Sequence, residues 1–425
     1  MIWGSVIFLI FVTIASYMRY RDLSCPAVLH NFLWIAALIG SMTIQAESEM
    51  NLGAIVIICA GSLIFQIGFD FSLKAQIGTG EKPSGYEYSV NVPMIRMVVI
   101  IVAVASLPSI YQYLIYIRGS VGDFYTILTS AEDALALPTY FSHFRKIIGD
   151  LSLVILAIYW TAEKDTRKNI RKYVIILFVV AVLFVASVPT RNGILSFALP
   201  LMILFVCTHN LSNKKIFLIL FISILGFMVV YYVISAGKYW YLYENSSDAQ
   251  SVLFDEIKVY LSGSIVAFGK TFKSHAFMYG GKNTFRFFMA VGDALFGTSS
   301  ALKLTNEFIS VSGISTNVYT FYDFYIRDFG VAYALFAQFI VSCIHGTSYK
   351  GMHRGELFQT YMFSMLSYPL IMQFFQDQYL SLLPTWIQII LVGIVVLKTN
   401  LFVQQTPLYD DSNDRNKEGR IWRAT

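Results

Sequence analysis

The stretch Thr316 to Cys343, TNVYTFYDFYIRDFGVAYALFAQFIVSC, begins as a polar, aromatic segment and ends as an apolar membrane span. Asp323, Arg327 and Asp328 are concentrated where the two parts meet. Ionisable residues at the end of a span usually face a bundle interior or an aqueous cavity, so they indicate a functional site. The alternative is an intrahelical ion pair, because Asp323 and Arg327 are four residues apart. On charge alone both interpretations stay open.

The composition indicates a polytopic membrane protein. Hydrophobic residues make up 56% of the 425 residues, aromatic residues 16% and charged residues only 13%. The mean hydropathy is +0.61, which an ordinary soluble domain of this length does not reach. The net charge of +5 does not indicate a nucleic-acid partner, because the basic residues cluster in short loops between apolar runs.

Apolar runs that approach the ~20 residues needed to cross a bilayer recur along the chain. They predict an all-α fold, a polytopic bundle of about eleven transmembrane helices. The first run lacks a positively charged start and is followed by Arg19 and Arg21, which indicates a retained span and not a signal peptide. The predicted spans are Ile2–Tyr17, Ala27–Ile44, Leu52–Phe71, Pro93–Ile117, Ile147–Thr161, Tyr173–Val188, Gly193–Cys207, Ile216–Ala236, Tyr325–Ile344, Leu357–Phe375 and Leu382–Lys398.

Basic residues occupy every second loop, which indicates the orientation of the chain. The opposite loops include residues 45–51 and 376–379, which carry acidic side chains and no basic one. Because cytoplasmic loops are rich in Lys and Arg, we expect a periplasmic amino terminus and a cytoplasmic carboxyl terminus. The basic set comprises Arg19, Arg21, Lys74, Lys82, Lys164, Arg167, Lys168, Arg171, Lys172, Lys214, Lys215, Lys350, Arg354, Arg415, Lys417, Arg420 and Arg423.

Two outer loops are longer than a connection requires. Arg118–Lys146 is expected to form a hairpin or a surface helix. Residues 237–315 are rich in aromatic side chains, and so long a loop inside a compact protein is usually functional. Apolar residues recur at helical spacing from Leu253 to Phe268 and again in Phe285–Phe296. We expect two amphipathic helices that lie on the outer membrane surface and cover a cavity.

The chain therefore divides into four predicted regions. Residues 1–236 hold transmembrane helices one to eight, and 237–315 form the large periplasmic loop. Residues 316–400 hold helices nine to eleven, and 401–425 form a polar cytoplasmic tail in which Asp410–Arg420 is expected to be disordered.

Motifs of several common enzyme classes are missing from the sequence. It contains no G-x-x-x-x-G-K-[ST] phosphate loop, no G-x-S-x-G elbow and no H-E-x-x-H motif. The four cysteines and six histidines are dispersed, without the spacing of a disulfide framework, a zinc site, a haem or an iron–sulfur cluster. We expect no metal and no cofactor, so that the substrate or a gradient supplies the energy.

Cations near aromatic residues are the remaining candidates for a site. Arg191 lies in the short outer turn Pro189–Gly193, where its planar guanidinium can bind two phosphate oxygens of a substrate. The alternative is that it only caps backbone carbonyls or contacts lipid phosphate. Lys238 follows a span in the segment GKYWY, which forms either an aromatic belt or a sugar-stacking wall. Arg286 is an isolated cation in an apolar amphipathic stretch.

The segment Thr316-Asn317-Val318-Tyr319-Thr320, followed by Tyr325, Asp328-Phe329-Gly330 and an apolar span, resembles the late signature of the O-antigen and oligosaccharide repeat-unit polymerases, the Wzy type. Tyr333 stands where members of that family often carry a small residue.

Two further stretches share features with the same family. The turn Arg191-Asn192-Gly193 is similar to its small-residue-Arg-Gly turn, although the preceding residues here are Pro and Thr. Arg286 and Gly297 are separated by ten residues, which matches an Arg-x10-Gly spacing. The span count and the large outer loop agree over most of the chain, whereas these motifs cover a few short stretches.

The resemblance implies a polymerase at the periplasmic face of a bacterial inner membrane. Such an enzyme moves a growing glycan from its undecaprenyl-diphosphate carrier onto a fresh lipid-linked repeat unit, with lipid diphosphate as the leaving group. Donor and acceptor are then undecaprenyl-diphosphate-linked oligosaccharides in the lipid bilayer. A chain-length regulator and a flippase in the same membrane are the expected protein partners, and no nucleotide sugar or metal is required.

The resemblance and the residue chemistry together suggest roles for individual side chains. Negative charge develops on the leaving diphosphate, and guanidinium groups in a dry cavity stabilise such charge. Arg191 and Arg327 are therefore assigned to the diphosphate, with Arg286 as a third binding group. Lys238, Asn317, Tyr319 and Tyr325 are the candidate sugar contacts.

The attacking sugar hydroxyl requires a base. A positioned carboxylate suits this task, and Asp328 and Asp323 are the two candidates near Arg327. His275, in the large outer loop, is the alternative base.

Two rival functions remain. An O-antigen ligase uses the same donor and differs in its acceptor, lipid A core. A lipid-linked oligosaccharide flippase is not an enzyme; it is expected to carry cations deep inside several spans and to have internal repeats, which the sequence lacks.

Overall fold

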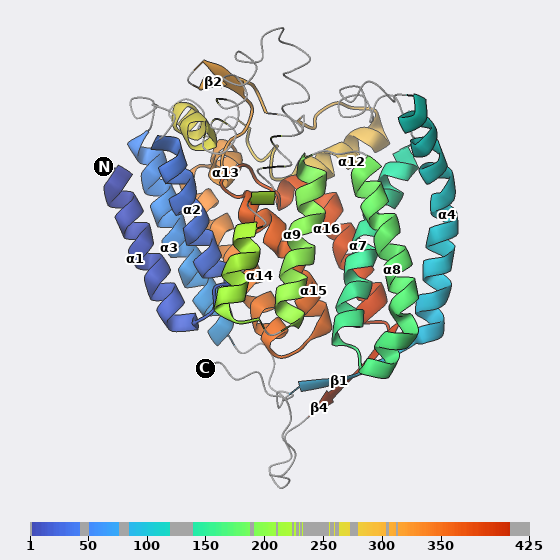
Figure 1. The fold of residues 1–425 in the computed structure, drawn as a ribbon. Helices are drawn as coiled ribbons and strands as arrows, with labels where there is room; N and C mark the ends of the chain where they lie inside the picture. Colours follow the sequence, from blue (N-terminus) through green and yellow to red (C-terminus); the bar gives the residue numbers. More distant parts are fainter. Residues whose placement is uncertain are drawn as a thin grey trace. The chain divides into compact units, whose positions relative to one another are not determined.

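Helices dominate the computed structural model, which confirms the predicted helical membrane class (Figure 1). The structure describes residues 2–42, 51–75, 85–119, 139–187, 191–209, 211–222, 225–226, 229, 232, 255, 259, 263–272, 279–302, 306–311 and 313–408. Within these residues, six helices are long and apolar enough to cross a membrane. They are Ile2–Tyr20, Leu52–Lys74, Val92–Gln112, Lys164–Ala186, Val331–His353 and Leu380–Leu397, while Pro26–Met42 and Asn192–Thr208 are apolar but shorter.

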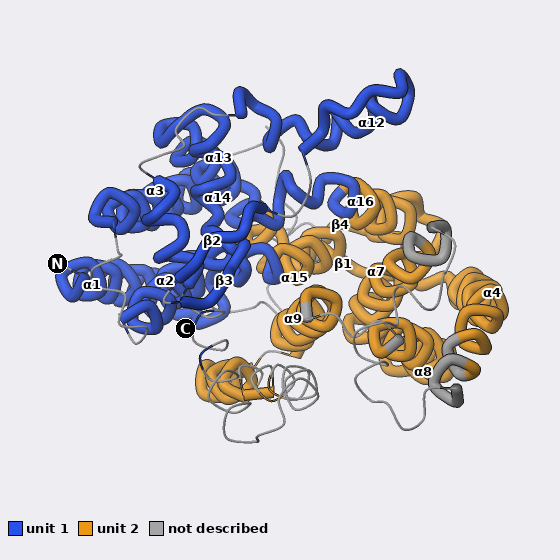
Figure 2. Tube along the Cα trace, turned by 90° about the horizontal axis from the view of Figure 1, so that it is seen from above, with its two compact units in different colours: residues 1–76, 250–347, 367–386 blue, residues 77–249, 348–366, 387–425 orange. Residues whose placement is uncertain are grey.

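The chain forms two compact units (Figure 2). Unit 1 consists of Met1–Gln76, Gln250–Thr347 and Ser367–Trp386. Unit 2 consists of Ile77–Ala249, Ser348–Leu366 and Ile387–Thr425. This division differs from the four sequential regions that hydropathy suggests, because segments far apart in the sequence combine within each unit.

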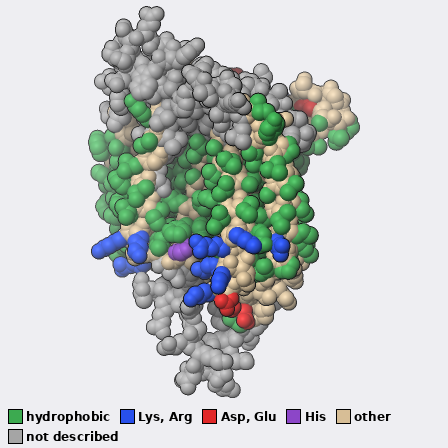
Figure 3. All heavy atoms as spheres, turned by 45° about the vertical axis from the view of Figure 1, so that its right-hand side comes forward, with side chains coloured by type: hydrophobic (Ala, Val, Ile, Leu, Met, Phe, Trp, Pro, Cys, Tyr) green, Lys and Arg blue, Asp and Glu red, His purple; other side chains and the backbone are tan. Residues whose placement is uncertain are grey.

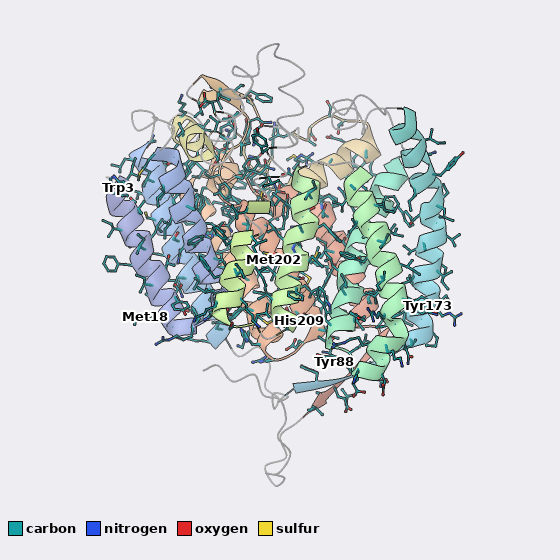
Figure 4. The ribbon with its side chains drawn as sticks, viewed as in Figure 1. Trp3, Met18, Tyr88, Tyr173, Met202 and His209 are labelled. Atoms are coloured by element: carbon teal, nitrogen blue, oxygen red, sulfur yellow. The ribbon has the colours of Figure 1, made fainter. Side chains whose placement is uncertain are left out.

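Unit 1 begins with three apolar helices that pack together: α1 (Ile2–Tyr20), α2 (Pro26–Met42) and α3 (Leu52–Lys74). The predicted spans cover the same segments. Trp3 and Met18, at the two ends of α1, are each 62% exposed (Figure 4), as expected for side chains that face lipid. The opposite side of the group is a packed core that includes Leu9, Leu38 and Ile58.

The predicted span Tyr325–Ile344 is two helices, and this corrects the prediction. Helix α13 (Phe321–Phe329) ends before Gly330, and α14 (Val331–His353) begins after it. Gly330 has φ 84° and ψ −175°, a conformation that only glycine adopts readily. Hydropathy does not reveal the break, because both helices contribute to one apolar run.

Unit 1 also contains α12 (Arg286–Phe296) and a small hairpin. Strand β2 (Ile309–Val311) pairs antiparallel with β3 (Ile314–Thr316), with Ile309 opposite Thr316. Val311 and Tyr319 pack with Val266 beneath the hairpin. The hairpin therefore leads the chain directly into α13.

In the part of unit 2 that the structure describes, helices lie over the segments where spans are predicted, and two of them start earlier than expected. These are α7 (Thr139–Thr161) and α8 (Lys164–Ser187), whose predicted spans begin at Ile147 and Tyr173. Helix α7 begins inside the predicted outer loop Arg118–Lys146. Residues 120–138 of that loop lie outside the described part of the chain. The helices described in this unit include α4 (Val92–Gly119), α7, α8, α9 (Arg191–Thr208), most of α16 (Leu383–Leu397) and the first part of α15 (Leu357–Met372). Residues 213–222 are helical too.

The all-α prediction did not anticipate a sheet between an internal loop and the tail. Strand β1 (Gly85–Val90) pairs antiparallel with β4 (Val403–Leu408), from Gly85 opposite Leu408 to Val90 opposite Val403. The hydroxyl of Tyr88 in β1 donates to the carbonyl of Gly355, and Figure 4 labels Tyr88 next to the sheet. Both paired strands belong to segments that the basic-loop pattern assigns to one side of the membrane.

The basic residues of α8 lie at the same end of unit 2 as this sheet. Arg96, in the first turns of α4 after β1, has its guanidinium carbon 5.9 Å from the ring centre of Tyr173 in α8. On the face drawn in Figure 3, Lys and Arg side chains gather along one border of the hydrophobic surface. This grouping agrees with the alternation of basic loops in the sequence.

Candidate functional site

The candidate site is built on α13, where the sequence concentrates its charged residues. Asp323 lies in the first turn of this helix and Arg327 in the last. Arg327 Nε is 2.6 Å from Asp323 Oδ2, and the two side chains are 5% and 6% exposed. An acid that precedes a base by four residues is the favourable order on a helix, and it also complements the helix dipole. The intrahelical pair that the spacing allowed is therefore confirmed, and it is buried.

A neighbouring helical segment, residues 263–272, supports the acid of this pair. Thr271 donates its hydroxyl to Asp323 Oδ1 at 2.8 Å. The carboxylate thus has a cation at one oxygen and a hydroxyl donor at the other. A buried carboxylate needs such partners, because it has lost the water that would otherwise solvate its charge. Removing one partner of a buried ion pair costs about 3–5 kcal/mol.

Two tyrosines flank the guanidinium of Arg327. Its central carbon lies 4.8 Å from the ring centre of Tyr319 and 5.8 Å from that of Tyr279. Nη1 also donates to the Tyr279 hydroxyl at 3.4 Å. A cation over an aromatic face is attracted by the electron-rich ring, more strongly where water is excluded.

The cation of this pair is retained despite burial. Loss of water lowers the pKa of the Arg327 guanidinium, but Asp323 and the Tyr279 hydroxyl outweigh that effect, and the pKa is raised above its ordinary value. Burial raises the pKa of the Tyr319 hydroxyl, which is neutral and donates to the Glu307 carbonyl at 2.8 Å. Arg327 therefore stays charged, paired with Asp323 and next to the neutral phenol of Tyr319.

Asp328 anchors the turn that leads into α12. Its Oδ1 accepts the Asn283 N–H at 3.1 Å, and its Oδ2 accepts the N–H and hydroxyl of Thr284 at 2.6 and 2.7 Å. Asn283 donates back to the Phe324 carbonyl at 3.0 Å. The carboxylate that the sequence nominates as a base is thus engaged in holding the 279–285 turn against α13.

Arg286 and Gly297 are the first residue of α12 and the residue that caps its end. The Arg-x10-Gly spacing is therefore the length of one helix. Arg286 Nε donates to the Leu302 carbonyl at 2.7 Å, and its side chain is half-buried. Because Thr284 is bonded to Asp328, the start of α12 and the Arg327 pair lie in one contiguous part of unit 1.

Tyr325 contacts a carboxylate that the sequence did not nominate. Its hydroxyl donates to Asp377 Oδ1 at 3.0 Å. Asp377 also accepts the Ser381 N–H at 2.8 Å and is 3% exposed. Burial raises the pKa of this carboxyl above its ordinary value. Tyr325 is itself buried and has no exposed face for a sugar in this conformation.

A buried chain of amides continues from this loop into the membrane helices. Gln338 Nε2 lies 3.2 Å from Gln373 Oε1 and 3.0 Å from His30 Nε2. Trp34 also donates to His30 Nε2 at 3.1 Å. Since an indole N–H only donates, His30 Nε2 is an acceptor and the ring is neutral. The backbone carbonyl of Gln373 in turn accepts the Phe321 N–H at the start of α13, at 2.8 Å.

Not every predicted site residue meets at α13. Asn317 is half-buried next to it, and its carbonyl accepts the Asn306 amide at 3.4 Å. Arg191 opens α9 in unit 2, but its side chain lies outside the described part of the structure. Lys238 and His275 also lie outside the described residues.

The sequence alone did not single out Thr271, Tyr279 and Asp377. Thr271 and Tyr279 lie in the long loop, where no motif distinguishes them from many other polar and aromatic residues. Asp377 was noted only as an acid in a short outer loop. Their importance comes from contacts across 40 or more residues, such as the 52-residue separation of Tyr325 and Asp377.

Among the described residues no cluster of His, Cys, Asp and Glu side chains has the arrangement of a metal site. No protein-family model matches this chain, and no curated protein or solved structure is significantly similar to it. The arrangement at α13 provides a buried guanidinium, two phenol rings and a nearby carboxylate. Chemically, this set is suited to binding an anion and accepting a proton beside it.

Proposed function

We propose that this chain is a glycosyltransferase that polymerises undecaprenyl-diphosphate-linked oligosaccharide repeat units into O-antigen or a related surface polysaccharide. The observation that carries the proposal is the buried guanidinium of Arg327, held between Tyr279 and Tyr319 directly before the span α14. Arg327 lies within the segment from Thr316 to Gly330 that resembles the polymerase signature, and Tyr319 and Asp323 of this segment contact it. A lipid-linked diphosphate is an anion whose tail remains in the bilayer, so a cation at the end of a span suits it.

The proposed reaction takes place at the periplasmic face of a bacterial inner membrane. The β1–β4 pairing supports this orientation, because it joins the carboxyl-terminal segment to a loop of the basic set. The basic start of α8 lies near the beginning of α4, which follows β1. Loops rich in Lys and Arg remain in the cytoplasm, so the amino terminus is assigned to the periplasm.

Diphosphate binding is expected to exchange one anion for another at Arg327. In the structure Asp323 neutralises this guanidinium. We infer that the donor diphosphate displaces Asp323 from the guanidinium of Arg327. The two tyrosine rings exclude water there, which strengthens the charge-assisted contact. The released Asp323 carboxylate stays in place through its bond from Thr271.

The released carboxylate then has the role of base. The acceptor sugar hydroxyl attacks the anomeric carbon of the growing glycan and gives its proton to Asp323. The bond between the anomeric carbon and the diphosphate oxygen breaks, and undecaprenyl diphosphate leaves with the negative charge stabilised by Arg327. The assignment of Asp328 as base is the weaker one, because its oxygens already accept three hydrogen bonds.

Reconstitution tests the proposal. The purified chain is placed in vesicles with lipid-linked repeat units and without nucleotide, and the products are separated by length. A ladder attached to undecaprenyl diphosphate supports the proposal. Transfer only to added lipid A core identifies a ligase, and movement of the lipid-linked unit across the membrane without bond formation identifies a flippase; either result contradicts it.

A further inference from the structure

The helix α12 has one face that nothing in the described chain covers. None of its residues is buried. Its apolar face consists of residues three or four apart, and the most exposed are Phe288 at 60%, Leu295 at 74% and Phe296 at 80%. Phe285 and Val291 complete this apolar face and are exposed to 48% and 42%. A face of large apolar side chains at this exposure usually marks an interaction surface.

The polar side of α12 is occupied by its own chain. Arg286 and Asp293 are seven residues apart and therefore lie on one side of the helix. Asp293 accepts the backbone N–H groups of Ser300 and Ala301 at 2.9 and 2.7 Å, and Arg286 donates to the Leu302 carbonyl. The segment after α12 thus folds back over the polar side and leaves the apolar face turned outward.

The position of α12 along the membrane normal follows from its attachment to α14. Thr284, two residues before α12, is bonded to Asp328, which lies three residues before α14. The 23 residues of α14 give a length of about 35 Å, close to the ~30 Å hydrocarbon core. The first residues of α14 therefore lie near the surface of the bilayer, and α12 begins at the same depth.

The apolar face of α12 is continuous with the outer surface of the span. A Cβ atom at Gly281 would come within 2.8 Å of the Phe329 ring and 3.0 Å of the Phe285 ring, so this glycine lies between the two rings. Phe329 packs in turn on Tyr333, in the first turn of α14, with ring centres 4.8 Å apart. Phe329 and Phe285 are 40% and 48% exposed, so exposed aromatic side chains lie at the end of α13, next to α14, and at the start of α12. In Figure 2 α12 projects away from the rest of unit 1.

We propose that α12 is an interfacial membrane anchor whose apolar face inserts among the lipids at the bilayer surface where α14 begins. A partner protein or a second copy is the alternative occupant. The lipid surface is favoured because the spanning helix already fixes the depth of α12 and because apolar surface is continuous between the two. Through Asp328, the same anchor fixes the position of the Arg327 pair relative to the membrane surface. This inference does not depend on the proposed function.

Spin labelling of the full chain in vesicles of phosphatidylcholine and phosphatidylglycerol tests the anchor. In a variant without its four native cysteines, single cysteines replace Leu295, Phe296 and, as the control on the other side of α12, the exposed Ala290. Each position carries a nitroxide, and its collision rates with oxygen and with a water-soluble nickel chelate are measured. We expect the oxygen-to-nickel ratio to be several-fold higher at Leu295→Cys and Phe296→Cys than at Ala290→Cys.

Three results would overturn the anchor. Equal ratios at all positions would place the apolar face in water. Spin–spin broadening that disappears on dilution with unlabelled protein would show that a second copy covers it. Low collision rates with both reagents, without broadening, would show that a protein segment covers it. Because the labelled sites are exposed and outside the Arg327 pair, glycan polymerisation by the same variants reports separately on the proposed function.

Discussion

Arg327 and Asp323 form an ion pair one helical turn apart on α13, with 2.6 Å between Nε and Oδ2 and side chains that are 5% and 6% exposed. Such a pair has two consequences. Removing one partner leaves an unpaired charge away from water, and any anion that binds the arginine must replace the aspartate. Stability and function at this site are therefore linked through the same two side chains.

Breaking the pair is expected to destabilise the protein more than removing it. Asp323→Leu should lower the free energy of unfolding by about 3–5 kcal/mol, because the Arg327 charge remains buried. The double variant Asp323→Leu/Arg327→Met should recover most of that loss. Denaturation in detergent of the wild type, both single variants and the double variant gives the coupling energy. Losses that simply add in the double variant would show that the two residues do not interact.

Asp328→Asn is expected to release the turn before α12. One carboxylate oxygen becomes an amide that cannot accept, so at least one of the donors from Asn283 and Thr284 loses its partner. An unsatisfied buried donor costs about 1–3 kcal/mol. Hydrogen exchange should accelerate in residues 279–286 and stay unchanged in α1. The matched control is Asp70→Asn, which alters the ion pair between Asp70 of α3 and Arg19 of α1. Equal hydrogen exchange of residues 279–286 in both variants would contradict the anchoring role of Asp328.

Gln338→Leu should loosen the loop that supports α13. The side-chain amide of Gln338 contacts His30 and the side chain of Gln373, and the backbone carbonyl of Gln373 accepts the Phe321 N–H. Leucine fills a similar volume but leaves the side-chain oxygen of Gln373 without this donor, at a cost of about 1–3 kcal/mol, whereas His30 Nε2 keeps the Trp34 donor. The midpoint of thermal unfolding in detergent should fall accordingly. Gln359→Leu on α15, a substitution of the same kind at a half-buried position outside this contact set, should have a clearly smaller effect.

The segment after α12 is expected to detach in acid. Backbone and hydroxyl donors from Ser300, Thr298 and Ala301 lower the pKa of Asp293 below its ordinary value. A carboxyl with a lowered pKa stabilises the folded segment above the unfolded pKa of about 3.9, and this stabilisation is lost as the pH falls through the lower, folded value. A nitroxide at Ser299→Cys should be immobilised at neutral pH and become mobile only in strong acid. With Asp293→Asn it should be mobile at every pH; a label equally immobile in both proteins would refute the contact.

Local features of the structure follow from the sequence where the physics is local. Hydropathy located most helices of both units, and helical periodicity in Phe285–Phe296 coincides with α12. The spacing of Asp323 and Arg327 allowed the ion pair that is present. These predictions succeed because apolar length, periodicity and four-residue spacing act within one helix.

Features that depend on distant contacts could not be predicted. Gln338 and His30 are separated by 308 residues, and no local pattern relates them. The break at Gly330 is hidden inside a continuous apolar run, and the β1–β4 sheet joins a loop to the tail. The roles of Thr271 and Tyr279 likewise arise from packing against α13. Tertiary contacts, not segment composition, determine all of these.

The rate of undecaprenyl diphosphate release by reconstituted protein tests the role of Arg327 most directly. We predict that Arg327→Ala slows this release by ~100- to 1,000-fold, as expected for loss of one preorganised donor to the leaving group, and that Arg327→Lys retains part of the rate. Arg171→Ala, an exposed position on α8, should match the wild type. A stably inserted Arg327→Ala protein that releases undecaprenyl diphosphate at the wild-type rate would contradict the proposal.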